Sequence, residues 1–265
     1  VKSYDHGLQM DDMVDMPEYE TLVDIEPIQK MPVAQLMDIP ALPAMATWVN
    51  LREFGAKGDG ETDDTKAIQE AIDKYDNIYV PQGWYRITET LKMKPDTKLI
   101  GLHPFGTQFR LDESTAAFSG FGGPKAMVES SEGGANMLMG IGINTGGYNY
   151  RAVGVKWMAN ADSYMNDVKF VGGHGGLWKP KPRGRWNRPA RISSPDNPVA
   201  ASGMDLAWDN QYWSLWVTNN GGGTFKDIWT ASTYATNGFY ANNTSTPGRI
   251  YAMSIEHHVR NEVRF

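Results

Sequence analysis

The sequence predicts an all-β fold in which short strands repeat along the chain like the turns of a solenoid. Segments with the alternating or wholly apolar pattern of strands recur to the end of the chain, and comparable segments lie about 20–30 residues apart where no insertion intervenes. The 28 glycines, 12 tyrosines and 9 tryptophans suit tight turns and flat stacking surfaces. With 265 residues, the chain is long enough for one elongated domain with a large core.

Residues 1–47 differ in composition from the rest of the chain. Up to position 40 they hold nine acidic residues against two lysines, and prolines interrupt every helical or strand period. We expect an extended acidic linker, or a strap that lies on the domain with its apolar residues as anchors. A functional acidic tail is the alternative. The domain itself is expected to comprise residues 48–265.

One helix is expected near the start of the domain, over residues 65–74, after a short strand at 49–51 and a turn-rich segment. Its apolar face is formed by Ile68, Ala71 and Ile72. The candidates for its N-terminal cap are Thr62, Asp63 and Asp64. Oxygen atoms of such side chains satisfy the free N–H groups of a first helical turn, and a carboxylate also complements the helix dipole. A metal site is the alternative interpretation of these aspartates.

Strand, turn and strand follow in NIYVPQGWYRI, and strand-like segments then continue to the end of the chain. Burial of parallel strands inside a repeating structure explains their β-branched and aromatic content. The further predicted strand segments are 91–102, 107–111, 126–130, 137–144, 152–158, 165–172, 212–219, 225–232, 238–243 and 249–256.

Residues 172–203 interrupt this rhythm with a segment that is rich in Gly and Pro and has no periodicity. Six basic residues fall within thirteen positions, together with Trp178 and Trp186. A loop longer than about 12–15 residues inside a compact domain is usually functional or disordered. We interpret the segment as a wall of a glycan groove, in which the tryptophans bind sugar faces. The alternative is a solvated interaction loop.

The opening of the domain carries a first resemblance. LREFGAKGDGETDDTKAIQEAID followed by IYVPQGWYRI resembles the start of the pectate-lyase-like superfamily. The resemblance implies a right-handed parallel β-helix with an N-terminal capping α-helix, which covers an otherwise open edge. It implies little about chemistry, because the superfamily includes lyases, hydrolases, epimerases and phage tailspikes.

The last stretch, Arg249 to Phe265, predicts two strands on either side of a polar corner. Apolar residues alternate with others on both sides of the corner, which consists of Glu256, His257 and His258. A glutamate beside two imidazoles at a strand end is a plausible acid–base site, and the imidazoles favour its ionised form. A solvated corner without a function is the alternative.

The segment from Gly203 onward carries a second resemblance. MDLAWDNQYWSLWVTNNGGGTFKDIWTAS and GRIYAMSIEHHV resemble glycoside hydrolase family 55, the β-1,3-glucanases built on right-handed β-helices. The resemblance implies that Glu256 is one of two active-site carboxylates, with Ser254, His257 and His258 as neighbours. Members of this family are inverting enzymes, whose two carboxyl groups stand about 6.5–9.5 Å apart. The resemblance implies that the general acid lies about one coil later, after Phe265. Because the last strand ends in an open edge, a continuation of the chain or a partner chain is expected there.

An aromatic cluster precedes the corner and predicts sugar binding. Aromatic rings stack on the C–H faces of sugars while planar polar groups bind the hydroxyl groups. The alternative for these rings is a role in core ladders. The predicted substrate ligands of this cluster are Trp208, Asp209, Gln211 and Trp213.

Composition excludes several classes of function. The net charge of −6 argues against a general nucleic-acid binder, and the absence of cysteine excludes disulfides and thiolate metal sites. No apolar run reaches the roughly 18 residues of a membrane span. The resemblance to glycoside hydrolase family 55 implies a secreted or cell-surface protein that hydrolyses a β-glucan polysaccharide and needs no metal or cofactor. The alternative is a non-catalytic glycan-binding or scaffolding β-helix of the tailspike kind.

Overall fold

The structure is a computed structural model that describes residues 2–12, 14–27, 29–31, 33, 39–147, 149–171, 211–230, 235–256, 258 and 260–265. The chain divides into two compact units, Val1–Asp38 and Ile39–Phe265.

The first unit contains an antiparallel hairpin of β1 (Ser3–Gln9) and β2 (Glu18–Asp24). The prolines of this acidic segment predict an extended linker or strap without regular strands. The observed register places Tyr4, His6 and Leu8 opposite Val23, Thr21 and Tyr19, so that these six residues share one face. The strands therefore follow an alternation of aromatic and polar residues, which is weaker than the apolar alternation of an ordinary strand.

The second unit opens with short elements around one helix. These are η1 (Met45–Thr47), β3 (Val49–Asn50), η2 (Leu51–Phe54), β4 (Asp59–Asp63) and α1 (Thr65–Lys74). The helix has the predicted bounds, and its predicted apolar face, Ile68, Ala71 and Ile72, is fully buried.

The capping prediction needs a correction. Asp64 stands at the N-cap position, but its side chain makes no capping bond. Its two carboxylate oxygens accept instead from the backbone N–H groups of Lys57 and Gly58, at 2.7 and 2.9 Å. Asp63 is the residue whose carboxylate accepts from the N–H of Thr65 in the first turn, at 3.1 Å. Asp64 therefore fastens the preceding turn, and Asp63 binds the helix.

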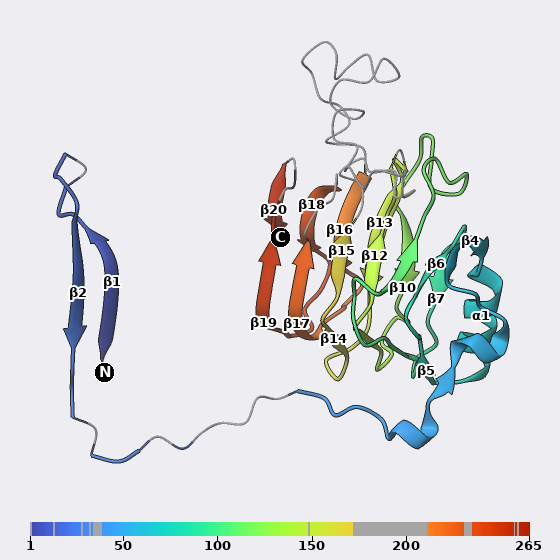
Figure 1. The fold of residues 1–265 in the computed structure, drawn as a ribbon, viewed down its shortest axis with the longest axis horizontal. Coiled ribbons are helices and arrows are strands. Elements are labelled where there is room, and N and C mark those ends of the chain that lie inside the picture. Colours follow the sequence, from blue (N-terminus) through green and yellow to red (C-terminus); the bar gives the residue numbers. More distant parts are fainter. Residues whose placement is uncertain are drawn as a thin grey trace, which may run out of the picture. The chain divides into compact units, whose positions relative to one another are not determined.

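Six parallel strands form one sheet, in the order β20-β18-β16-β13-β10-β7 (Figure 1). Their bounds are Leu91–Lys92 for β7, Lys125–Glu129 for β10, Ala152–Trp157 for β13, Gln211–Val217 for β16, Ala235–Ala241 for β18 and Asn261–Arg264 for β20.

A second sheet contains two rows of parallel strands that meet at β17 (Gly223–Thr230), which also pairs with β19 (Gly248–Ile255). One row consists of β3, β5 (Asn77–Tyr79), β8 (Lys98–Ile100), β11 (Met137–Met139) and β14 (Tyr164–Asn166). The other row consists of β4, β6 (Gly83–Arg86), β9 (Thr107–Arg110), β12 (Gly142–Asn144) and β15 (Lys169–Val171).

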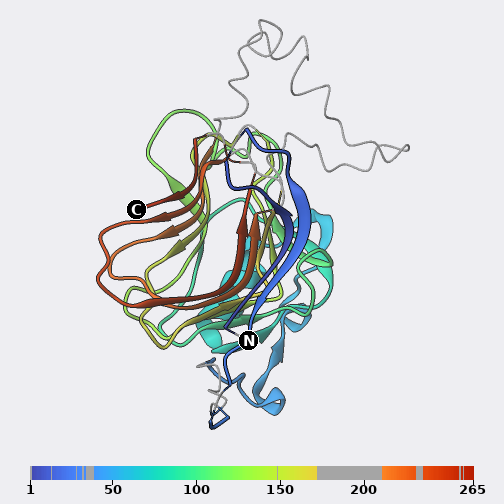
Figure 2. The ribbon, with the colours of Figure 1, turned by 90° about the vertical axis from the view of Figure 1, so that its left-hand side faces the viewer.

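The chain visits these rows in a fixed order. The runs β8-β9-β10 and β11-β12-β13 each pass through both rows of the second sheet and then enter the first sheet, and equivalent strands pair in parallel. Figure 2 shows the strands wrapped around a common interior. The predicted all-β class with largely parallel pairing is thereby confirmed.

Buried side chains at equivalent positions form ladders along the three rows. The core is therefore continuous from one repeat to the next, and each repeat is stabilised by its neighbours. The ladders are Leu99-Leu138-Met165-Phe225, Tyr85-Phe109-Ile143-Phe170 and Val128-Val155-Leu215-Phe239.

One sharp bend recurs between the two rows of the second sheet. The residue at the bend has a left-handed backbone in four repeats, with φ values of 61° for Gly140, 49° for Asp167, 52° for Asp227 and 59° for Ala252. Glycine and aspartate adopt this conformation more readily than most residues. This explains the aspartates at the same position of MNDVKF and FKDIWT.

Candidate functional site

The polar corner after β19 has the predicted form. β19 ends at Ile255 and β20 begins at Asn261, so two strands flank the corner as the alternation indicated. β19 pairs with β17 and β20 pairs with β18. The corner therefore connects the second sheet to the first.

Glu256 is held at this corner by two residues of β17. The indole Nε1 of Trp229 donates a hydrogen bond to Oε1 of Glu256. The backbone N–H of Glu256 donates to Oγ1 of Thr230 at 2.9 Å, and the Thr230 hydroxyl donates to the backbone oxygen of Glu256 at 3.3 Å. Thr230 is fully buried, whereas Trp229 and Glu256 are half-buried. The neighbouring strand thus fixes the backbone, and the indole orients the carboxylate.

An aromatic and a polar side chain lie beside Trp229, the donor to this carboxylate. The ring of Phe105, which is 43% exposed, meets the Trp229 ring edge-on at a centroid distance of 5.9 Å. Ser254 is exposed and lies in register with Trp229 on the neighbouring strand. An oriented carboxylate beside partly exposed rings can position a water molecule and bind the apolar face of a sugar. We call Glu256, Trp229, Phe105 and Ser254 the Glu256 site.

His258 lies in a different environment although it is only two residues further on. Its side chain is fully buried, and its Nδ1 lies 2.7 Å from Oε2 of Glu262. Its Nε2 lies 3.2 Å from the hydroxyl oxygen of Ser214 in β16. Gly238 makes room for the ring, because a Cβ atom there would lie 2.6 Å from Cε1 of His258. Both ring nitrogens therefore link β16 to the start of β20, and a catalytic role for His258 stays a prediction.

Gln211 and Trp213 belong to β16, beside the corner. The amide of Gln211 is buried and already engaged: its oxygen accepts from the Thr145 hydroxyl at 2.7 Å, and its nitrogen donates to the Gly146 carbonyl at 2.9 Å. Trp213 is half-buried, and its ring centroid lies 4.7 Å from those of both Trp216 and Tyr240. The other predicted site residues, His257, Trp208, Asp209, Trp178 and Trp186, lie outside the described residues.

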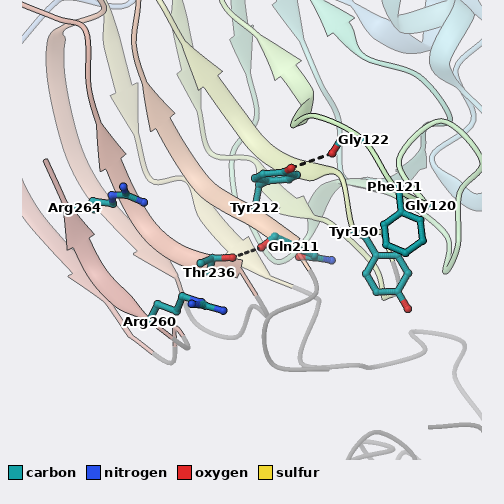
Figure 3. A pocket seen from close by; sticks show the side chains of 9 residues that line it. All are labelled: Gly120, Phe121, Gly122, Tyr150, Gln211, Tyr212, Thr236, Arg260 and Arg264. Carbon is teal, nitrogen blue, oxygen red and sulfur yellow. Dashed lines mark hydrogen bonds between the residues drawn. The ribbon is translucent and has the colours of Figure 1, made fainter. Parts of the chain in front are cut away.

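A pocket of about 430 Å³ opens beside β16, β18 and β20. Tyr212 lies between two arginines, Arg260 and Arg264, and two rings, Phe121 and Tyr150 (Figure 3). None of the two arginines and two rings is a ligand predicted from the sequence. The alternation of Arg260 and Arg264 along the last strand indicated only that both project on one side. The 120–123 loop, GFGG, had no signal beyond its glycines.

Two kinds of feature, metal-ligand clusters and membrane-spanning helices, were sought in the part of the chain that the structure describes. There, no group of three or more His, Asp or Glu side chains could hold a metal ion. Likewise, no helix within the described ranges has the length and apolarity to cross a bilayer.

The family can now be assigned. Residues 48–248 match the family described as rhamnogalacturonase A/epimerase, pectate lyase-like. The chain belongs to this family. The match begins at the residue where the domain was expected to begin, and it confirms the broader of the two resemblances. The narrower one, to glycoside hydrolase family 55, stays a prediction.

Two relatives match short stretches of this pectate-lyase-like chain. The chain is 42% identical over 53 residues to a preneck appendage protein of Bacillus phage PZA and 44% identical over 57 residues to a probable glucan endo-1,3-beta-glucosidase of Arthroderma benhamiae. Each match covers 20% of this chain and 6% of the relative. A solved structure, the A-module of the mannuronan C-5 epimerase AlgE4 of Azotobacter vinelandii, aligns over 82% of this chain and 52% of its own, with 16% identity and a TM-score of 0.37.

Proposed function

We propose that the chain is a carbohydrate-active right-handed parallel β-helix, capped by α1, that hydrolyses a β-1,3-glucan-like polysaccharide outside the cell. The observation that carries the proposal is the Glu256 carboxylate, which the Trp229 indole orients beside the partly exposed Phe105 ring. Family membership supports a carbohydrate substrate. The glucan-glucosidase name of one relative supports the choice of glucan.

Glu256 acts as the base in this proposal. Hydrolysis with inversion needs one ionised carboxylate that activates water and one protonated carboxyl group, about 6.5–9.5 Å away, that protonates the leaving oxygen. The indole N–H hydrogen bond orients Glu256 for this role, because it is donated to one carboxylate oxygen. The proposal requires a second carboxyl group at this distance from Glu256 as the general acid. His258 supports the corner through Glu262 and Ser214.

The decisive test is reducing-sugar release by the full-length protein, and by its Glu256→Gln variant, on a panel of β-glucans and uronic-acid polymers. Glutamine retains an oxygen that can accept from Trp229 but cannot act as a base. We expect a loss of about 10²–10⁴-fold in activity on β-1,3-glucan with an unchanged melting temperature. Glu70→Gln, on the exposed side of α1, is the matched control and should keep full activity. Retained activity in Glu256→Gln, or no product from any glucan, would overturn the proposal.

The second candidate is a glycan-binding or scaffolding β-helix without catalysis. The pocket beside β16 and β20 favours it, because arginine and aromatic side chains line it and no described lining residue is Asp or Glu. Binding of oligosaccharides without turnover by the full chain would decide for this candidate.

A further inference from the structure

The pocket beside β16, β18 and β20 has a local charge opposite to that of the chain. The chain has a net charge of −6, yet Arg260 and Arg264 line this pocket and no described lining residue carries a carboxylate. Its volume of about 430 Å³ lies within the usual range of small-ligand sites. The pocket is therefore a local positive site of ligand size on an acidic protein.

The aromatic wall is presented by an anchored loop. The Tyr212 hydroxyl donates to the Gly122 carbonyl at 2.9 Å, and Nε of Arg151 donates to the Gly123 carbonyl at 3.1 Å. Gly122 is required there, because its φ is +147° and a Cβ atom would lie 2.9 Å from Nε of Arg151. The Phe121 side chain between these anchors is fully exposed. An exposed ring on an anchored loop can stack on the apolar face of a sugar.

The opposite wall is anchored to the first sheet. The backbone N–H of Arg260 donates to the Thr236 carbonyl at 3.2 Å, and Arg264 pairs with Tyr240 in the register of β18 and β20. The Arg264 guanidinium lies 4.9 Å from the centroid of the Tyr240 ring. Figure 3 shows both arginines on one side of Tyr212 and the rings of Phe121 and Tyr150 on the other.

We propose that this pocket binds an anionic saccharide unit, with its C–H face on the rings of Phe121 and Tyr150 and its carboxylate or sulfate group on Arg260 and Arg264. Guanidinium groups bind planar or tetrahedral oxyanions through paired hydrogen bonds, and rings bind the apolar face of a sugar. The inference rests on the glycan binding in the proposed function, but it adds a site separate from the Glu256 site. A polysaccharide that binds in this pocket must therefore carry acidic units or substituents.

The test is calorimetric titration of the full chain with four oligosaccharides of similar length. These are oligogalacturonate, its methyl ester, a sulfated galactan fragment and a β-1,3-gluco-oligosaccharide. We expect oligogalacturonate or the sulfated fragment to bind at least about tenfold more tightly than the two neutral probes, with an affinity that falls as salt is added. The stronger of the two anions identifies the group that the arginines recognise. Equal affinity for oligogalacturonate, its ester and the sulfated fragment would overturn the proposal.

Variants assign the binding to this pocket. Arg260→Gln and Arg264→Gln should each weaken anion binding by about tenfold. Phe121→Ala should weaken it with an unchanged salt dependence, because the substitution removes a ring and no charge. Lys66→Gln, at an exposed position of α1, is the charge-matched control and should bind as the parent does. Unchanged binding in both arginine variants, at an unchanged melting temperature, would contradict the proposal.

This inference and the proposed hydrolysis can fail separately. Glu256→Gln should retain anion binding in the pocket, because Glu256 does not line it. Anion binding without release of reducing sugar from any glucan would overturn the hydrolysis alone. Hydrolysis of neutral glucan without any preference for anionic probes would overturn the pocket inference alone.

Discussion

The carboxylates at the two ends of the second unit have different kinds of hydrogen-bond donor. Near its start, Asp59 accepts from the backbone N–H groups of Glu61 and Thr62, at 2.9 and 2.8 Å, and Asp64 accepts from two more backbone N–H groups. Near its end, the carboxylate of Glu256 accepts from the side chain of Trp229 on a neighbouring strand.

The difference separates carboxylates that accept from the backbone of their own segment from one that accepts from a side chain of another strand. A carboxylate that accepts from nearby backbone amides replaces backbone hydrogen bonds that the turn cannot make. The backbone of Glu256 is held by the Thr230 hydroxyl, and its carboxylate by the Trp229 indole. We infer that substitutions of the aspartates change stability, whereas substitutions at the Glu256 site change function.

The largest stability effect is expected for Asp64→Ala. Asp64 is only 1% exposed, and its removal leaves the N–H groups of Lys57 and Gly58 without their acceptor. Two such donors should lower the free energy of unfolding by about 3 kcal/mol. Urea unfolding measures the loss, and activity per folded molecule should be unchanged. An equal loss in Glu256→Ala would break the distinction between the two carboxylates.

His258→Ala is expected to resemble the aspartate variants and not Glu256→Gln. The substitution removes a fully buried ring that contacts both Glu262 and Ser214. The free energy of unfolding should fall by about 2 kcal/mol, and the pH optimum of glycan hydrolysis should stay the same. Loss of activity without loss of stability would show that His258, like Glu256, acts in catalysis.

Trp229→Phe examines the Glu256 side of the comparison. Phenylalanine keeps a ring beside Phe105 but removes the Nε1–H donor to the carboxylate. A hydrogen bond to a charged group is worth about 1.5–3 kcal/mol, so we expect kcat to fall at least about tenfold. Trp216→Phe, which removes a similar donor to Asn242, is the matched control and should retain kcat. An equal fall in both variants would show that the effect is not specific to Glu256.

The sequence predicted the repeating elements better than the side-chain partners. The helix at 65–74 and the two strands around Glu256 follow from periodicity, because burial on one face enforces it. The hydrogen-bond donor of each aspartate could not be predicted, because it depends on which backbone N–H groups point at the carboxylate. Trp229 and Phe105 come together across separate repeats, which no local pattern encodes.

The smallest effect is expected for Asp59→Asn, and it is a change in pH dependence. Hydrogen bonds from Thr62 and Glu61 lower the pKa of the exposed Asp59 carboxyl from 3.8 to about 2. Its contribution to stability is therefore present above pH 3.8 and is lost as the pH falls toward about 2. Asp64 has the opposite sign, because burial raises its pKa, so its titration stabilises the fold as the pH falls.

Urea midpoints of the parent and Asp59→Asn at two pH values separate these contributions. Above pH 5 the parent should be the more stable of the two, and near pH 2.5 the difference should shrink, because Asp59 in the parent is then partly protonated. Solvent screening keeps the effect small at an exposed position. Asp73→Asn, on the same unit, is the control for removal of one acidic charge. A difference that stays constant from pH 5 to 2.5 would mean that the backbone amides bind the Asp59 side chain regardless of its charge.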